Sequence, residues 1–94
     1  MMQQIVIVIA GNSREFHQCM HEKIDAAPEG TKIEYRKNVH RCDIGNTSYR
    51  LASMPDQLRG LRGVKVEYYG TWERLPRERL ALFREIARYA EMPR

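Results

Sequence analysis

Residues 5–10, Ile-Val-Ile-Val-Ile-Ala, form an apolar run that no polar residue interrupts. Five of these six residues are β-branched, which favours a strand over a helix. A strand without polar alternation is buried on both faces, so it belongs in the interior of a parallel or mixed sheet. The run is far shorter than the roughly 20 apolar residues that a membrane-spanning helix needs. The chain is therefore expected to fold as an α/β domain around this strand.

A tight turn and a helix are predicted directly after the buried strand. Gly11 permits the turn, and Asn12 can cap a helix in which Glu15 stands three residues further on. Apolar side chains then follow at helical spacing and form one stripe, made of Phe16, Cys19, Met20 and Ile24. The helix is expected to end before Pro28 and Gly30, because both residue types interrupt helices.

Three more strands and two more helices are predicted in the rest of the chain. The strands occupy residues 31–39, 47–52 and 64–70, and the helices begin at Pro55 and near Pro76. The first of these strands has a charged face, as edge strands do, and residues 40–46 after it are expected to form a loop or bend. The order β-α-β-β-α-β-α predicts a three-layer α/β sandwich with a mainly parallel four-stranded sheet, Rossmann-like or P-loop-like in outline.

The composition is that of one globular domain spanning residues 1–94. The net charge is +4, and residues 48–94 account for all of it, mostly through arginine. Arginine favours bidentate contacts with phosphate or carboxylate groups, so an anionic partner is compatible with this charge. Two cysteines are too few for a disulfide framework. No basic segment precedes the apolar run as in a signal peptide, and a cytoplasmic location is expected.

Two loops are the predicted place of a binding site. Ligands of open α/β sheets bind beyond the carboxyl ends of the strands, and a helix N-terminus attracts anions. If the first and last predicted strands are neighbours, the loops after them face each other. The candidate ligand-binding residues are Gly11, Asn12, Ser13 and Arg14 in the first loop and Gly70, Thr71, Trp72 and Arg74 in the second. The alternative is that the first loop is only a turn and cap, and that Trp72 clamps the last helix.

Two basic segments extend this hypothesis to nucleic acids. Arg59 and Arg62 stand in Arg-Gly steps before the last predicted strand, where glycine lets the backbone approach a phosphate closely. Arg36, Lys37 and Arg41 form the other segment. The aromatic side chains interleaved with these segments, which could stack on bases, are Tyr35, Tyr49, Tyr68, Tyr69 and Trp72. A solvated charged surface would explain the same residues.

Histidine and cysteine residues offer candidates for metal binding and catalysis. His17 and His21 stand four residues apart, which on a helix is the spacing of zinc-binding H-E-x-x-H proteases. Gln18 replaces the glutamate that serves these enzymes as general base, and two solvated histidines are the alternative. Cys42 has charged neighbours that could activate a thiol, but no third group to orient it. Neither enzyme activity nor a cofactor is therefore predicted.

Two segments resemble the ATPase core of phage large terminases and related helicases. In residues 5–16 a strand, a phosphate-type turn and a helix follow one another, and in residues 51–70 Leu-Arg-Gly-Leu-Arg-Gly leads into a strand. The family's G-x-x-x-x-G-K-[ST] loop is replaced here by "AGNSREF", without lysine or second glycine. Its paired acids are replaced by "EYYG". The resemblance therefore implies a degenerate relative without ATPase activity, similar to small phage-encoded accessory proteins.

The sequence as a whole predicts a non-enzymatic binding protein of phage or mobile-element type. Its expected ligand is a nucleotide-like or nucleic-acid anion at the carboxyl-terminal edge of the sheet, with Arg59 and Arg62 as a basic rim. The alternative is a protein-binding inhibitor or regulator of a larger host enzyme, with aromatic and arginine side chains at its interface. The directions of Tyr69 and Trp72 distinguish the two hypotheses. Side chains turned into a crevice beside Gly11 favour a nucleotide, and side chains on a convex face favour a protein.

Overall fold

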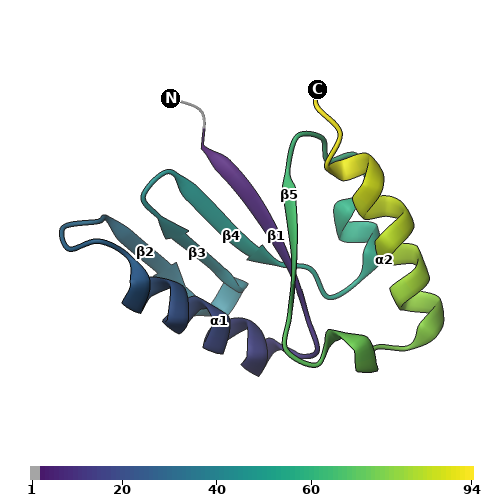
Figure 1. Cartoon of the computed structure of the whole chain (residues 1–94), viewed down its shortest axis with the longest axis horizontal. Helices are drawn as coiled ribbons and strands as arrows, with labels where there is room; N and C mark the ends of the chain where they lie inside the picture. The colour runs from purple at the N-terminus through teal and green to yellow at the C-terminus, as the bar shows by residue number, and fades with distance from the viewer. Residues whose placement is uncertain (1–2) are drawn as a thin grey trace.

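The computed structural model describes residues 3–94 and shows a five-stranded sheet with two long helices (Figure 1). The strands are β1 (Gln4–Ala10), β2 (Ile33–Arg36), β3 (Arg41–Ile44), β4 (Thr47–Leu51) and β5 (Lys65–Tyr69). The helices are α1 (Ser13–Ala26) and α2 (Arg77–Ala90). Short 3-10 turns occur at Lys37–Val39, Pro55–Leu58 and Trp72–Arg74.

The sheet is mixed and has the strand order β2-β3-β4-β1-β5. β1 lies parallel to both of its neighbours, β4 and β5, whereas β2, β3 and β4 are joined by antiparallel pairing. The prediction of a mainly parallel, four-stranded, Rossmann-like or P-loop-like sandwich is therefore wrong. Antiparallel strands need no crossover helix between them. Here residues 37–40 join β2 to β3, and a two-residue turn joins β3 to β4.

The strand that accounts for this difference is β3, in the segment predicted as a loop. Its four residues alternate charged and apolar side chains, and Gly45 and Asn46 form a two-residue turn into β4. Gly45 has a φ of 59°, a left-handed conformation that glycine adopts without strain. A Gly-Asn step between two alternating segments is a hairpin signal, so the sequence contains the information for this turn.

The apolar run of β1 is buried on both faces, as predicted. Val6 and Val8 pack with α1 on one face of the sheet. Ile7 and Ile9 pack with α2 on the other face. The two helices therefore cover opposite faces, and β1 contributes to both apolar clusters.

The first helix begins as predicted, while the predicted helix at residues 55–61 is shorter. The side chain of Asn12 accepts a hydrogen bond of 2.9 Å from the backbone N–H of Glu15 and caps α1. The second segment forms a single 3-10 turn, because Arg59 has extended backbone and Gly60 has a φ of 81°. No helix within residues 3–94 has both the length and the apolar character needed to cross a membrane.

One face of the sheet is covered across its width, and the other face is covered only in part. The apolar cluster under α1 includes side chains from every strand. The cluster under α2 draws on β1, on β5 and on the segment after β4, but contains no described residue of β2 or β3. The α2 side of β2, β3 and β4 is therefore an open sheet face.

Candidate anion-binding site

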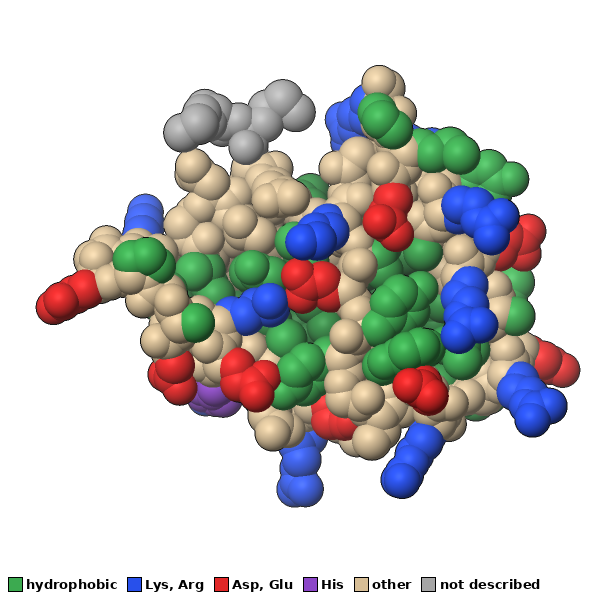
Figure 2. Space-filling model, viewed as in Figure 1, with side chains coloured by type: hydrophobic (Ala, Val, Ile, Leu, Met, Phe, Trp, Pro, Cys, Tyr) green, Lys and Arg blue, Asp and Glu red, His purple; other side chains and the backbone are tan. Residues whose placement is uncertain are grey.

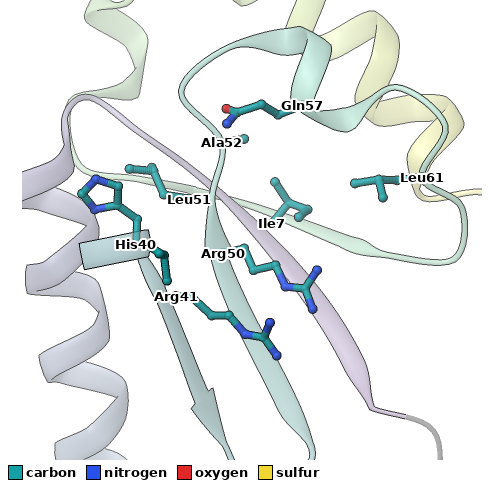
Figure 3. Close-up of a pocket in the computed structure, with 9 residues that line it drawn as sticks. Ile7, His40, Arg41, Arg50, Leu51, Ala52, Gln57 and Leu61 are labelled. Carbon is teal, nitrogen blue, oxygen red and sulfur yellow. The ribbon is translucent and has the colours of Figure 1, made fainter. Parts of the chain in front are cut away.

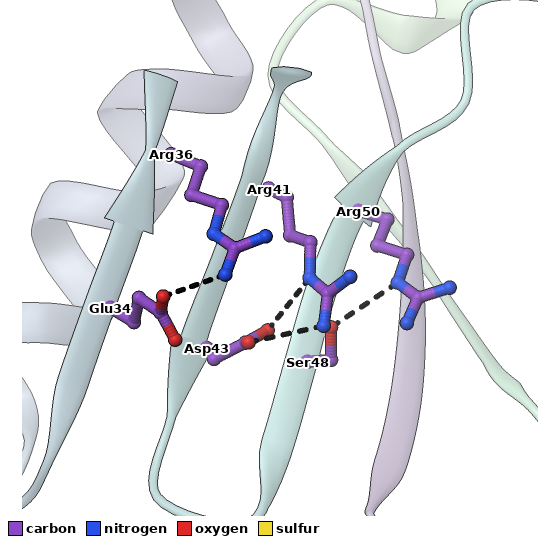
Figure 4. A network of polar contacts seen from close by, with 6 residues as sticks. All are labelled: Glu34, Arg36, Arg41, Asp43, Ser48 and Arg50. Carbon is purple, nitrogen blue, oxygen red and sulfur yellow. Dashed lines mark hydrogen bonds and ion pairs between the residues drawn. The ribbon is translucent and has the colours of Figure 1, made fainter. Parts of the chain in front are cut away.

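Three arginines stand side by side on the open sheet face, one on each of β2, β3 and β4. Arg36 pairs in register with Arg41, and Arg41 pairs with Arg50. The residues next to them along the strands are Tyr35, Cys42 and Tyr49, which pack in the α1 cluster. Because side chains alternate along a strand, the arginines point to the opposite face. Figure 4 shows the three guanidinium groups extending in the same direction, and we call them the arginine row.

Asp43 is the most firmly bonded acceptor beside the arginine row. Its two carboxylate oxygens accept hydrogen bonds from Nε and Nη2 of Arg41, each 3.1 Å long. The exposed fractions of the Arg41 and Asp43 side chains are 30% and 15%, so water reaches this pair poorly. Burial alone would raise the pKa of Asp43, but the hydrogen bonds from Arg41 and Ser48 outweigh it and lower the pKa below its ordinary value. Asp43 is therefore charged at neutral pH.

The outer two arginines of the row have weaker partners. Arg36 donates to Glu34 at 2.7 Å, but about half of each side chain is exposed, so this pair contributes little stability. Arg50 donates through Nε to the hydroxyl of Ser48 at 3.2 Å and forms no ion pair within residues 3–94. Three guanidinium groups face two carboxylates here. The arginine row therefore has an excess positive charge, and Arg50 is the cation without a carboxylate.

The alignment of the arginine row is unfavourable for the free protein. Like charges directly opposite each other on neighbouring strands destabilise a sheet. Arg41 has such a neighbour on both sides. An anion bound between two guanidinium groups would remove this repulsion, and the planar fork of arginine suits phosphate and carboxylate.

A cavity of about 360 Å³ adjoins the arginine row (Figure 3). Its volume lies within the range of small-molecule sites, about 300–1,000 Å³. Arg41 and Arg50 line one side of the cavity, with their guanidinium groups extending along the strands away from His40 and Gln57, which line other sides. Its apolar lining consists of Ile7, Val39, Leu51, Ala52 and Leu61. The cavity therefore combines a cationic end with an apolar wall and neutral polar groups.

The position of the cavity follows from the connections of β1 and β4. β1 continues into α1 on one face of the sheet, and β4 continues into the 3-10 turn at Pro55–Leu58 on the other face. The two strands are parallel neighbours. Connections that leave adjacent parallel strands on opposite faces open a crevice at the carboxyl ends of those strands, where open α/β sheets bind ligands.

Gln57 is held at the cavity by the backbone of its own turn. Its Oε1 accepts hydrogen bonds from the N–H groups of Ser53 and Met54, at 2.6 and 3.0 Å. These bonds use only the amide oxygen. The amide nitrogen of Gln57 is therefore the group that can donate to a ligand in the cavity.

His40 connects the cavity to two side chains on the covered face. Its Nδ1 lies 3.1 Å from Nε2 of His17, and Nδ1 of His17 lies 2.5 Å from the hydroxyl oxygen of Tyr35. Burial lowers the pKa of His17, and the charges of His40, Lys37 and His21 lower it further. Both ring nitrogens of His17 are thus engaged. Within residues 3–94 there is no cluster of three metal-ligating side chains, so the structure adds no support to zinc binding by His17 and His21.

The two loops predicted to hold an anion lie side by side, but a carboxylate fills the space between them. Glu15 accepts hydrogen bonds of 2.8 and 2.9 Å from the N–H of Thr71, and of 2.6 and 2.9 Å from its hydroxyl. These bonds lower the pKa of Glu15, and the charge of Arg74 contributes less. A Cβ atom added at Gly11 or Gly70 would contact the Glu15 carboxylate. The geometry therefore favours the arginine row over these loops as an anion site.

Among the other loop residues, Asn12 serves as the cap of α1 and Ser13 is the first residue of that helix. Arg14 and Arg74 are exposed. Arg14 lies over a shallow basic surface with His17 and Lys37. These side chains do not converge on one place.

Arg59 and Arg62, the predicted basic rim, lie in the connection between the Pro55 turn and β5. Arg59 pairs with Asp56 at 2.7 Å, and Arg62 donates to the carbonyl of Leu61 at 2.7 Å. The Arg62 guanidinium also lies 6.0 Å from the ring centre of Tyr89. Because Leu61 lines the cavity, this connection borders it, although both guanidinium groups contact other parts of the surface.

Tyr69 and Trp72 point to opposite faces of the sheet and not into a common crevice. Tyr69 donates to Glu22 on α1 at 2.5 Å, and this hydrogen bond raises the pKa of Tyr69 to about 12. Trp72 packs in the α2 cluster, 4.7 Å from Tyr68 between ring centres and 5.8 Å from the guanidinium of Arg84. Figure 2 shows apolar side chains between β5 and α2, with basic side chains along α2, which are all arginines. This second surface has the composition of a protein interface.

Arg36 and Arg41 were predicted as part of a basic segment, whereas Arg50 and the alignment of the three arginines were not predicted. Pairing the strands around the Gly45-Asn46 turn places Arg41 opposite Arg50, so the hairpin signal leads directly to this pair. The residues of the cavity are far apart in the sequence, and the contact between His17 and His40 had no sequence signal.

No protein-family model, no curated protein and no solved structure matches this chain. The resemblance to phage ATPase cores therefore stays a prediction. The geometry of the arginine row and the cavity is the basis for the function proposed below.

Proposed function

We propose that this domain binds a nucleotide-like phosphate anion in the cavity beside the arginine row, without catalysing a reaction. The phosphate would bind between Arg41 and Arg50, and the remainder of the ligand would lie against the apolar wall, with Gln57 at its edge. The observation that carries the proposal is the position of Arg50. It lies at a cavity of ligand size, next to a like charge, and it has no carboxylate partner in the described part of the chain.

The lining of the cavity supports this ligand class over a bare inorganic ion. An inorganic phosphate would use the guanidinium groups and leave the half-buried apolar side chains of Leu51 and Leu61 in contact with water. A nucleotide brings an anionic group and a planar, partly apolar group within one molecule. Burying the second group against these side chains would add a hydrophobic contribution of roughly 25 cal/mol per Å².

The test is a calorimetric titration of the protein with AMP, with ATP and with a short single-stranded oligonucleotide. In the Arg50→Gln variant we expect affinity to fall about 10- to 100-fold, because a hydrogen bond to a charged group contributes about 1.5–3 kcal/mol. The matched control is Arg77→Gln, which removes the same charge from an exposed position at the start of α2. This control variant should bind as the wild type does.

The three ligands also separate a free nucleotide from a nucleic-acid strand. Binding of AMP and ATP identifies a mononucleotide site. Binding of the oligonucleotide alone identifies a strand, and the dependence of its affinity on salt should then be less steep in Arg50→Gln. An equal loss of affinity in Arg50→Gln and Arg77→Gln would mean that net charge, and not the arginine row, binds the ligand.

The surface between β5 and α2 supports a second candidate function, the binding of another protein. The exposed fraction of Tyr68 is 37%. Together with Trp72 and Arg84 it provides the aromatic and arginine side chains that are enriched at binding hot spots. Titrations without any heat change for the three ligands would favour this candidate over the first.

A further inference from the structure

The arginine row extends beyond the cavity to the edge of the sheet. Arg50 lies on β4, Arg41 on β3 and Arg36 on β2, which is an edge strand. Arg41 and Arg50 line the cavity, and Arg36 lies one strand further out. Neighbouring strands are about 4.8 Å apart, so the backbone positions of Arg36 and Arg50 are separated by roughly 10 Å. The row is therefore longer than the part of it that lines the cavity.

A single phosphate group is too small to contact the whole arginine row. Hydrogen bonds between a guanidinium group and a phosphate oxygen are about 2.7–2.9 Å long. A phosphate held between Arg41 and Arg50 therefore leaves Arg36 without a contact to the ligand. Figure 4 shows the three guanidinium groups on the same face and extending in the same direction. A second or third phosphate group joined to the first would reach the guanidinium of Arg36.

The residues in register with the arginine row determine which way a bound nucleotide would lie. Ile7 on β1 is the register partner of Arg50 and continues the row with a buried apolar side chain. Leu61, which lines the cavity, comes from the connection that leads to β5 on the far side of β1. The row thus has an apolar end at β1 and a charged end at β2. A nucleoside at the apolar end would direct its phosphate groups across β3 toward Arg36.

Arg36 can exchange its partner for a phosphate more easily than Arg41 can. The guanidinium of Arg36 donates to Glu34 at 2.7 Å, but the exposed fractions of the two side chains are 53% and 52%. Water therefore screens this pair, and its loss costs little stability. Arg41 keeps its bonds to Asp43, whose side chain is only 15% exposed. These bonds use two of the five N–H groups of Arg41, so three can still donate to a ligand.

We propose that the site binds a nucleoside di- or triphosphate, and that Arg36 is a further ligand-binding residue, which contacts the second or third phosphate group. Arg41 and Arg50 bind the first phosphate group, and Arg36 turns from Glu34 to the ligand. No covalent bond is formed or broken. This inference rests on the proposed function and specifies its ligand class as a chain of phosphate groups, in contrast to a monophosphate.

The test is calorimetry with AMP, ADP and ATP in EDTA, for the wild type and for Arg36→Gln. At 0.15 M salt the Debye length is about 8 Å, so the extra charge of ATP acts mainly through groups that it contacts. We expect the wild type to bind ADP or ATP about 10-fold more tightly than AMP, because a hydrogen bond to a charged group is gained. Arg36→Gln should bind AMP as the wild type does and ADP and ATP with similar affinity to AMP.

Two further variants separate a contact of Arg36 from an effect of net charge. Lys32→Gln removes a positive charge from an exposed position four residues before Arg36, about 13 Å away in an extended chain, and should keep the preference for ATP. Glu34→Gln removes the competing carboxylate, so its affinity for ATP should rise while its affinity for AMP stays unchanged. An equal loss of ATP affinity in Arg36→Gln and Lys32→Gln would contradict the proposal.

Equal affinities of the wild type for AMP, ADP and ATP would overturn this inference and leave the proposed function intact. If none of the three nucleotides binds, the proposed function fails, and this inference fails with it. Should Arg36→Gln not fold, the ¹⁵Nε signal of Arg36 in the wild type decides the question. This signal should shift on addition of ATP and not of AMP, and a signal that ATP leaves unchanged would contradict the proposal.

Discussion

Replacing Asp43 by Asn should make the protein less stable and its anion binding tighter. The carboxylate of Asp43 accepts two hydrogen bonds from Arg41, and the exposed fraction of its side chain is only 15%. The loss of a charge-assisted pair of this kind costs about 1.5–3 kcal/mol. In a domain of this size each kcal/mol lowers Tm by about 4–8 °C. The same change removes a negative charge beside the cavity and frees Arg41, so the affinity for AMP should rise.

The matched control is Glu34→Gln, which removes a carboxylate from the neighbouring strand. Its partner Arg36 has an exposed fraction of 53%, and exposed pairs contribute about 0–1 kcal/mol. Urea denaturation at pH 7 measures both variants, and calorimetry with AMP gives their affinities. Equal stability of Asp43→Asn and the wild type, or an equal loss in Glu34→Gln, would refute the reasoning. So would an Asp43→Asn variant that is destabilised without any gain in affinity.

The pH dependence gives this prediction a second check. The pKa of Asp43 in the folded protein lies below the ordinary value of 3.8, so the unfolded chain binds its proton first as the pH falls. The stabilisation by Asp43 is therefore fully present above about pH 4 and is lost below it. The difference between the wild type and Asp43→Asn should shrink on acidification from pH 5 to pH 2.

Two further predictions concern the covered face and the loops. The pKa of His17 is lowered from 6.5, so the unfolded state binds more protons than the folded state does. The free energy of unfolding should therefore fall as the pH drops below about 6.5. In urea denaturation of His17→Gln, this part of the pH dependence should be absent. Gly70→Ala should lose more stability than Gly60→Ala. Both glycines have a positive φ, which costs an alanine about 1–2 kcal/mol. Only at Gly70 would the added Cβ atom also meet the carboxylate of Glu15. Equal losses in thermal denaturation would show that Glu15 moves aside freely.

The elements with long, regular patterns could be predicted from the sequence. The uninterrupted run of β1 indicated a strand buried on both faces, and the Asn12 cap and the apolar stripe after it indicated α1. The hairpin of β3 and β4 was missed because a four-residue strand with two charged side chains resembles a loop. Because β3 was not predicted, the sheet was expected to be mainly parallel, whereas it is mixed.

The candidate site depends on pairing that composition does not reveal. Arg36, Arg41 and Arg50 look like three solvated charges in the sequence, and only the register of β2, β3 and β4 makes them a row. The loops at Gly11 and Gly70 had the composition of an anion site, and they do lie together. Their space is taken by Glu15, a residue whose part in the sequence analysis was confined to capping α1.

The most direct test of the account is an amide and side-chain NMR titration of the ¹⁵N-labelled protein with AMP. The account predicts that shift changes concentrate at Arg41, Arg50, His40 and Gln57, which line the cavity. Shift changes confined to Gly11–Arg14 and Gly70–Arg74 would contradict it and place the anion at the loops. An unchanged spectrum would exclude a nucleotide site in the cavity altogether.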